Sequence, residues 1–448
     1  MDQVVNSKSL RQLFDEDQKK GGDIERKHFP QALSLKYKIA FLKRYKKYLY
    51  ASLRKEKISK EELQAKVTRQ QSALKARREQ YEESVNKLLS ETADLINKRE
   101  FRIELKAIAE PINGKQAYTI GSSLACILAA KHLQKALKEL YEVKQTSRDL
   151  IISQVKSITL DDFPKYLIKS DISSFYESVD HKHLLEQLHS STKLSVLAKR
   201  LITRMVKDYT SLSGTSKGLP RGVGISAYLA EIYLQSIDQE LNNSSDLIYY
   251  SRYVDDMLLA YAPKSESHVA SYLTNLKAAL KKKGLGVNSK TEEIDFLAQQ
   301  KGNFEYLGYA FKIDGSSKKV LLSQKKLDKY RARIKKSFDD YNKKHKAMPE
   351  KSTAELISRI SFLTSNTRLF NKKSNAFIGI YFGNKYINDT SQLKGLDLYL
   401  SHLIKSIGSA KLKKRLGRLS FEAGFTKKIF RSFDEKTLSA ISRGWLHG

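Results

Sequence analysis

Three aspartates have the residue type and spacing for metal-assisted chemistry. Asp255 and Asp256 are adjacent within Tyr-Val-Asp-Asp, with apolar, strand-favouring residues on both sides. Asp171 ends another apolar run 84 residues earlier. Adjacent carboxylates between apolar strands are costly unless cations neutralise them, and Mg²⁺ prefers oxygen ligands. If folding joins Asp171 to the pair, the three could hold two metal ions for phosphoryl transfer; the alternative is ordinary surface turns.

The aspartates need strand ends to display them. Residues 247–260 are expected to form two short strands with Asp255 and Asp256 at the turn, and residues 166–171 a strand that ends on Asp171. Between them, residues 217–227 form a glycine-rich loop before a helical run, a setting in which backbone can approach a base or phosphate closely. His181 and His183 form a lone H-x-H that we interpret as structural, because no third ligand is indicated.

Composition indicates a folded protein that binds a polyanion. The chain has 448 residues, 82 Lys and Arg against 49 Asp and Glu, and a net charge of +33, for which nucleic acid is the expected partner. Its 40% hydrophobic content is too high for a disordered basic tail. The single cysteine, Cys126, excludes an intramolecular disulfide or a multi-cysteine zinc site within the chain. With no visible signal peptide or membrane-length apolar run, we expect a cytoplasmic protein that does not enter a membrane.

The pattern divides the chain into three expected parts. Residues 1–100 are a basic helical region, residues 101–312 alternate strand-like and helical segments, and residues 313–448 are again helical and basic. In the first part Tyr37, Phe41, Tyr45 and Tyr48 recur on one helical face, among ten basic residues and one acidic residue between positions 36 and 60. We interpret these aromatics as core residues; stacking on bases is the alternative.

The ordered set of motifs resembles the palm of reverse transcriptases. It comprises Asp171 in Ser-Asp-Ile-Ser-Ser-Phe-Tyr, Leu-Pro-Arg-Gly ending at Gly222, Tyr-Val-Asp-Asp ending at Asp256, Lys290-Thr291, and Phe-Glu-Tyr-Leu-Gly ending at Gly308. The likeness covers roughly residues 100–312. It is greatest to bacterial enzymes of the group II intron and retron lineage, especially the defence-associated, abortive-infection branch.

The resemblance implies a role for each matching residue. Asp171, Asp255 and Asp256 would be catalytic and would hold two Mg²⁺ ions, or Mn²⁺ in their place, with the Ile172 carbonyl as a further ligand. The nucleotide-binding residues would be Tyr176 as a gate against ribose, Gly222 beside the new base pair, and Lys290 near the triphosphate, where it could donate a proton to the leaving pyrophosphate. Tyr306, Leu307 and Gly308 would form the primer grip.

Two positions depart from the family pattern. Arg221, a further nucleotide-binding candidate, stands where many relatives carry glutamine, so a permanent cation replaces a polar contact. Lys115 is the candidate triphosphate lysine of the fingers, but the arginine that usually follows is missing and Tyr118 lies nearby. These departures leave atypical priming or templating open.

The expected fold is α+β: a right-hand polymerase with fingers and palm, a helical N-terminal region and an all-helical C-terminal thumb-like region. The expected function is RNA-directed DNA polymerisation from deoxynucleotides on an RNA template, with a DNA product. By resemblance alone, we expect the template to be a dedicated non-coding RNA and the protein to act in antiphage defence. The resemblance also allows a homo-oligomer.

Three rival functions remain at this point. An RNA-dependent RNA polymerase shares the palm, although Tyr176 argues against it. A template-independent or protein-primed DNA polymerase would leave its product attached to protein. A catalytically silent nucleic-acid-binding scaffold would not need its aspartates.

Overall fold

The computed structural model describes residues 4–111, 114–143, 147–371 and 374–446. The chain forms two compact units, each built from separated segments. Unit 1 consists of Met1–Lys144, Ser174–Asp238 and Lys283–Leu285, and unit 2 of Gln145–Ser173, Gln239–Lys282 and Gly286–Gly448. No helix in the described part of the chain is long and apolar enough to span a membrane.

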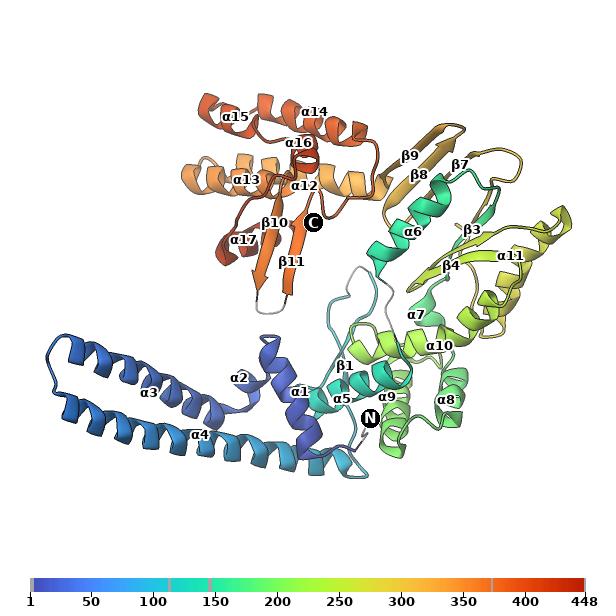
Figure 1. Ribbon diagram of the computed structural model, residues 1–448. Coiled ribbons are helices and arrows are strands. Elements are labelled where there is room, and N and C mark those ends of the chain that lie inside the picture. Colours follow the sequence, from blue (N-terminus) through green and yellow to red (C-terminus); the bar gives the residue numbers. More distant parts are fainter. Residues whose placement is uncertain (1–3, 112–113, 144–146, 372–373, 447–448) are drawn as a thin grey trace. The chain divides into compact units, whose positions relative to one another are not determined.

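Unit 1 begins with four helices. They are α1 (Ser7–Lys19), α2 (Ile24–His28), α3 (Pro30–Arg54) and α4 (Lys60–Asn97). α3 starts with proline at its first turn, and the Ser59 hydroxyl caps α4 by accepting from the Glu62 amide at 3.1 Å. α3 and α4 run side by side as a long helical hairpin (Figure 1). The helical N-terminal region predicted for residues 1–100 therefore agrees with the elements observed there.

The aromatic side chains of α3 do not lie in a core. The exposed fractions are 68% for Tyr37, 66% for Phe41, 36% for Tyr45 and 63% for Tyr48. The prediction that these residues are core residues is therefore wrong. The physical reason is that α3 is covered mainly by one partner helix, α4, which shields only part of its circumference.

The rest of unit 1 surrounds the glycine-rich loop. Its elements are β1 (Leu105–Ala107), β2 (Tyr118–Ile120), α5 (Leu124–Leu140), α7 (Phe175–Ser178), α8 (His181–Ser190), α9 (Val196–Ser213) and α10 (Gly224–Asn242), whose last residues belong to unit 2. α5 and α9 are strongly amphipathic and place aliphatic residues in the core. α10 follows the loop directly, as the sequence predicted.

Unit 2 contains a four-stranded antiparallel sheet in the order β4-β5-β3-β6. Its strands are β3 (Tyr166–Asp171), β4 (Leu247–Tyr253), β5 (Asp256–Tyr261) and β6 (Glu292–Asp295). α6 (Arg148–Leu160) packs Ile151 and Val155 into one cluster with Leu167 of β3. α11 (Glu266–Lys281) stacks Tyr272 on Tyr261, with ring centroids 4.0 Å apart. The two helices thus hold the strands that carry the aspartates.

A second sheet and a mostly helical region complete unit 2. The sheet has the order β7 (Lys301–Tyr306), β8 (Tyr309–Asp314) and β9 (Ser317–Leu322). The helices are α12 (Gln324–Lys344), α13 (Pro349–Leu363), α14 (Ser391–Lys405), α15 (Ala410–Leu416), α16 (Phe421–Thr426) and α17 (Glu435–Leu446).

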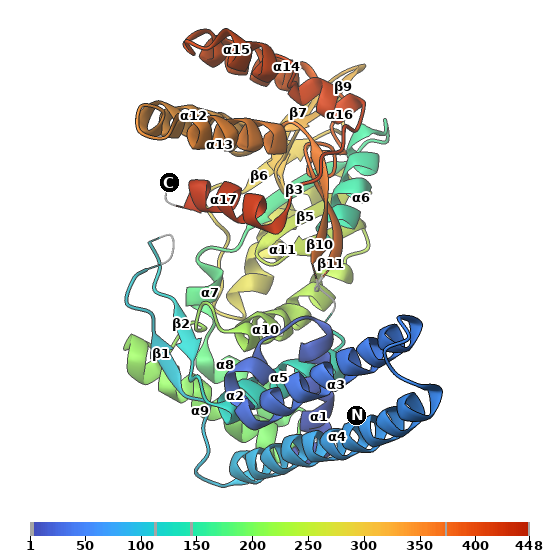
Figure 2. The same cartoon turned by 90° about the vertical axis from the view of Figure 1, so that its left-hand side faces the viewer.

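The C-terminal region is not all-helical, which corrects one detail of the expected fold. β9 and the antiparallel hairpin of β10 (Asn366–Asn371) and β11 (Ser374–Gly379) lie within residues 313–448 (Figure 2). Asn366 joins the hairpin to the segment after α16, because its amide donates to the Ile429 carbonyl at 2.8 Å. Local helical periodicity could not reveal a pairing of this kind, which depends on residues 63 positions apart.

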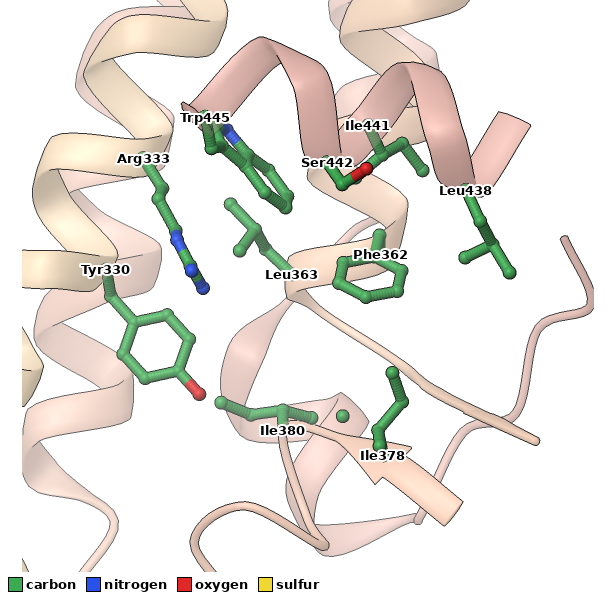
Figure 3. A pocket seen from close by; sticks show the side chains of 11 residues that line it. Tyr330, Arg333, Phe362, Leu363, Ile378, Ile380, Leu438, Ile441, Ser442 and Trp445 are labelled. Atoms are coloured by element: carbon green, nitrogen blue, oxygen red, sulfur yellow. The ribbon is translucent and has the colours of Figure 1, made fainter. Parts of the chain in front are cut away.

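A hollow of about 470 Å³ lies among α12, α13, β11 and α17 of this region (Figure 3). The Arg333 guanidinium lies 5.0 Å from the centre of the Trp445 ring, and Phe362 packs against Trp445 from α13. These contacts anchor α17 to the helices before it.

Candidate active site

Strand register brings the three aspartates together within unit 2. β3 and β5 are antiparallel, and Asp171 is directly opposite Asp256. Directly opposed residues share a face of the sheet, with Cβ atoms roughly 4.5–5.5 Å apart. The Ile172 amide donates to the Asp255 carbonyl at 3.1 Å, so the turn that carries Asp255 is tied to the end of β3. The predicted arrangement, two strands with the pair at their turn and Asp171 at a strand end, is confirmed.

The turn between β4 and β5 is tight and conformationally unusual. Tyr253 pairs with Asp256, which leaves Val254 and Asp255 as a two-residue connection. Val254 has a φ of +60°, which is rare for a β-branched residue and costs free energy. The Arg252 guanidinium donates to the Val254 carbonyl at 3.0 Å and supports this conformation. The strain is stored where the turn presents Asp255.

Burial and repulsion from neighbouring carboxylates act together on Asp256. Burial, followed by the charges of Asp255 and Asp171, raises the pKa of Asp256 to about 6. Lys169, two residues before Asp171 on the same face of β3, opposes this rise. Burial and the two neighbouring carboxylates thus both penalise the charge on Asp256, and a bound cation would relieve this penalty.

The donor set suits magnesium held jointly with a substrate. In the described residues, no group of three or more His, Cys, Asp or Glu side chains is arranged to hold a metal ion by itself. Mg²⁺ commonly takes only one or two protein carboxylates and completes its coordination with water and substrate phosphates. The opposed Asp171 and Asp256, with Asp255 beside them, fit that mode of binding.

Asn288 is a functional candidate that sequence reasoning missed. Its amide N–H donates to the Asp171 carbonyl at 2.7 Å, and its side-chain Nδ2 donates to Asp171 Oδ2 at 3.2 Å. Its own carbonyl accepts from Thr291 Oγ1 at 2.8 Å, while Thr291 Oγ1 lies 2.9 Å from Ser170 Oγ. Asn288 thus orients Asp171. The available signal was its position two residues before Lys290, between a glycine pair and the lysine-threonine pair.

The predicted primer-grip residues form the turn between β7 and β8. Tyr306 is buried, and its hydroxyl lies 3.4 Å from both the Asp256 carbonyl and Ser251 Oγ. Leu307 and Gly308 both have positive φ, +44° and +79°, as two-residue hairpin turns require. The Arg148 guanidinium donates to the Leu307 carbonyl. Tyr306 therefore contacts both strands that adjoin the Asp255–Asp256 turn, β4 and β5. Contact of the β7–β8 turn with a primer stays a prediction.

Lys290 and Ile172 are placed differently with respect to solvent. Lys290 is exposed, and its backbone amide donates to Asn288 Oδ1 at 3.0 Å. This hydrogen bond links the backbone of Lys290 to the residue that orients Asp171. The Ile172 side chain is buried, and Ile172 forms a bridge with Val287. Metal ligation by the Ile172 carbonyl and a triphosphate contact by Lys290 stay predictions.

Three of the predicted nucleotide-binding residues meet in unit 1 around an unpredicted carboxylate. Arg221 forms a bidentate pair with Glu177, with N–O distances of 2.7 and 2.9 Å, and Lys115 Nζ lies 3.2 Å from Glu177 Oε1. The Arg221 guanidinium lies 5.1 Å from the centre of the Tyr176 ring. Burial alone would raise the pKa of Glu177, but hydrogen bonds from Arg221 and Lys115 outweigh it and lower the pKa. Two cations on one carboxylate leave a net positive charge beside Tyr176.

Position 222 requires glycine, because the backbone of Tyr118 lies too close to it to leave room for a side chain. Its φ is +89°, and a Cβ there would lie 2.7 Å from the Tyr118 carbonyl oxygen. The Tyr118 amide donates to the Arg221 carbonyl at 2.7 Å, so β2 is bound to the glycine-rich loop. The predicted contact of Gly222 with a base pair is a separate matter and stays a prediction.

His181 is used structurally, in agreement with the interpretation of the H-x-H pair. Its ring is buried, with Nε2 2.7 Å from the Gly218 carbonyl and Nδ1 3.1 Å from Thr210 Oγ1. Asp180 caps α8 by accepting from the His183 amide at 3.0 Å. Both ring nitrogens of His181 are therefore occupied by protein partners.

The segment that carries this site matches a known family. Residues 120–311 match the family described as reverse transcriptase (RNA-dependent DNA polymerase). The matched segment contains all three aspartates, the glycine-rich loop and the turn between β7 and β8. Residues 120–311 thus match a reverse transcriptase domain, in agreement with the predicted right-hand polymerase fold and the predicted enzyme class, an RNA-directed DNA polymerase.

Solved structures show distant likenesses. The chain is similar to telomerase from Candida tropicalis truncated from its C-terminal domain, with 15% identity over 50% of this chain and 55% of that chain, and a TM-score of 0.35. It is also similar to telomerase from Candida albicans in complex with a fragment of telomeric RNA, with 13% identity over 73% and 67% of the two chains, and a TM-score of 0.37. The chain spans 61% of the length of apo telomerase from C. tropicalis, at 14% identity and a TM-score of 0.36. No curated protein matches the chain.

Proposed function

We propose that this chain extends a DNA strand with deoxynucleotides by copying RNA. The observation that carries the proposal is the register that sets Asp171 opposite Asp256, with Asp255 in the adjoining turn, inside a reverse transcriptase domain. Phosphoryl transfer needs compensation of negative charge at the reacting phosphate, and three neighbouring carboxylates that would recruit divalent cations suit this need.

The residues of the chain have distinct roles in this proposal. Asp171, Asp255 and Asp256 would hold two Mg²⁺ ions, which when bound supply charge neutralisation and a lowered hydroxyl pKa. Asn288 keeps Asp171 in its orientation through two hydrogen bonds, and Tyr306 supports the backbone of Asp256. Lys290 would contact the triphosphate and protonate the leaving pyrophosphate.

Selection of the sugar is assigned to unit 1. Tyr176 would close on the space of a ribose 2′-hydroxyl, and the Arg221 guanidinium against its ring would hold the gate in place. Lys115 and Arg221 would attract the triphosphate, with Gly222 beside the new base pair. Replacing Tyr176 by alanine should then admit ribonucleotides.

The lineage and setting are part of the proposal and rest on the sequence motifs. We place the chain with the bacterial group II intron and retron-like enzymes, in the defence-associated branch, acting in the cytoplasm on a dedicated non-coding RNA. The large positive charge agrees with an RNA partner of this kind.

The test is incorporation of labelled deoxynucleotides by the purified chain with Mg²⁺, before and after nuclease and protease digestion. The double variant Asp255→Asn/Asp256→Asn should lose at least about 10³-fold in rate, since it removes the charge that recruits the metal. Asp314→Asn, an exposed carboxylate in the same unit, is the matched control and should retain full rate.

Each outcome separates this function from a rival. A product that requires RNA and copies its sequence supports the proposal. A product that forms without RNA and stays bound to protein after nuclease treatment would indicate protein-primed synthesis instead. Absence of incorporation under every condition, with nucleic-acid binding intact, would indicate a scaffold.

A further inference from the structure

α3 presents a row of aromatic rings to solvent that the polymerase site does not use. We call Tyr37, Phe41, Tyr45 and Tyr48 the aromatic stripe; they are spaced by four, four and three residues, which places them along one helical face. Each is at least 36% exposed, and three exceed 60%. A contiguous exposed apolar patch of this kind marks an interaction site in a folded protein.

Three of the four rings of the stripe are arranged as a series of near-parallel faces. Phe41 and Tyr45 have centroids 6.4 Å apart and planes inclined by 7°, and Tyr45 and Tyr48 have centroids 6.3 Å apart and planes inclined by 20°. Parallel aromatic faces are the feature on which successive bases of a single strand stack. A duplex cannot use them, because its base faces are already stacked internally.

The surroundings of the stripe are strongly cationic. Residues 36–78, which cover most of α3 and the first half of α4, contain 15 Lys and Arg against 3 Glu, a net charge of +12. On α3 itself, Lys38 and Arg44 lie on either flank of the stripe, each within about 70° of its centre at 3.6 residues per turn. Within the described part of the chain, neither of these two cations has a carboxylate within 4 Å.

We propose that the α3–α4 hairpin (Figure 2) is a docking surface for single-stranded RNA, with bases stacked on the aromatic stripe and phosphates on the flanking cations Lys38 and Arg44. The choice of RNA rests on the proposed function, in which the enzyme must hold an RNA strand. A second copy of the chain is disfavoured as occupant, because it would bring the same positive charge to the same face.

The experiment measures binding of the full chain to a fluorescein-labelled 20-nucleotide oligo(U), with oligo(dT) and a blunt RNA duplex of equal length in parallel. The variant Tyr37→Ala/Phe41→Ala/Tyr45→Ala/Tyr48→Ala should bind oligo(U) roughly tenfold or more weakly, since each stacked base contributes measurably. The matched control is Phe163→Ala with Leu398→Ala, two exposed apolar residues outside the hairpin that should leave binding unchanged. Because all four positions are exposed, the variant should fold as the parent does, and circular dichroism checks this.

Two further variants separate stacking from charge and from simple apolar contact. Replacing the four aromatics by leucine keeps apolar area but removes the flat faces, so binding should stay as weak as in the alanine variant. Lys38→Gln/Arg44→Gln should lower the slope of log K against log salt by about 1 to 1.5, while the alanine variant should leave that slope unchanged.

Several results would overturn the inference. They are binding of the alanine variant within about threefold of the parent, full binding by the leucine variant, equally tight stripe-dependent binding of oligo(dT), or self-association of the parent chain that the alanine variant abolishes. The inference and the proposed function can fail separately. Stripe-dependent RNA binding by a chain that incorporates no deoxynucleotide would refute the function alone, and RNA-copying synthesis with stripe-independent binding would refute this inference alone.

Discussion

At the scale of single residues, Asp256 carries the electrostatic cost of assembling the site. It is half-buried between Asp171 and Asp255, and its pKa is raised from 3.8 to about 6. Because the folded chain holds this proton more tightly than the unfolded chain, the group stabilises the fold below about pH 4. That contribution is lost as the pH rises through 6.

Replacing this carboxylate should therefore stabilise the chain in the absence of metal. At pH 7.5, Asp256→Asn should raise the free energy of unfolding by about 1 kcal/mol, a value discounted for solvent screening of a half-exposed group. Urea denaturation at pH 7.5 and pH 4 measures it, and the gain should vanish at pH 4. Mg²⁺ should stabilise the parent at pH 7.5 but not the variant; equal stabilisation of both would contradict the metal assignment.

Asn288 should behave as a positioning residue and not as a catalytic one. Asn288→Ala removes the side-chain hydrogen bond to Asp171 but keeps the backbone bond. We expect kcat to fall roughly tenfold to a hundredfold, as when an outer partner of a metal ligand is lost, with KM for deoxynucleotide nearly unchanged. The Mg²⁺ concentration for half-maximal rate should rise. Unchanged kcat and Mg²⁺ dependence would show that Asp171 is held without Asn288.

At the scale of elements, the glycine-rich loop lies so close to β2 that Gly222 has no room for a side chain. Gly284, which has a similar backbone conformation but open space around it, serves as a comparison. Gly222 and Gly284 both belong to unit 1 and both have positive φ, +89° and +68°. A Cβ on Gly222 would lie 2.7 Å from the Tyr118 carbonyl oxygen, whereas a Cβ on Gly284 would meet nothing within 4 Å.

This contrast gives a matched pair of variants. Gly284→Ala should cost about 1 kcal/mol of stability from backbone strain alone. Gly222→Ala should cost about 1–3 kcal/mol more, because β2 or the loop must also move. Thermal and urea unfolding of the two variants measure the difference, and similar losses in both would show that β2 gives way without cost.

At the scale of the whole molecule, the net charge of +33 should dominate binding to nucleic acid. Affinity for a 20-nucleotide RNA should fall by at least about 10²-fold between 50 and 200 mM KCl, because each neutralised phosphate releases counterions. Fluorescence anisotropy at four salt concentrations gives the slope. A slope near zero would mean that the basic residues do not contact the phosphates.

The sequence alone determined which three carboxylates form the candidate site and which local elements carry them. Asp171, Asp255 and Asp256 could be recognised because strand patterns and turn residues are local, and because the order of motifs along the chain restricts how they can meet. The positions of the strands around these aspartates, and of the helix after the glycine-rich loop, were predicted for the same reason.

Only the tertiary structure decided which residues support those aspartates and which surfaces stay open. The bonds of Asn288 to Asp171 and of Arg221 to Glu177 join positions 117 and 44 residues apart, and no local pattern encodes such distances. The helical spacing of the aromatic stripe predicted that its residues would be buried in a core. It lies in solvent because burial depends on how many neighbours a helix has, and α3 is covered mainly by α4. The periodicity of a helix reports which residues share a face, whereas only the packed fold decides what that face meets.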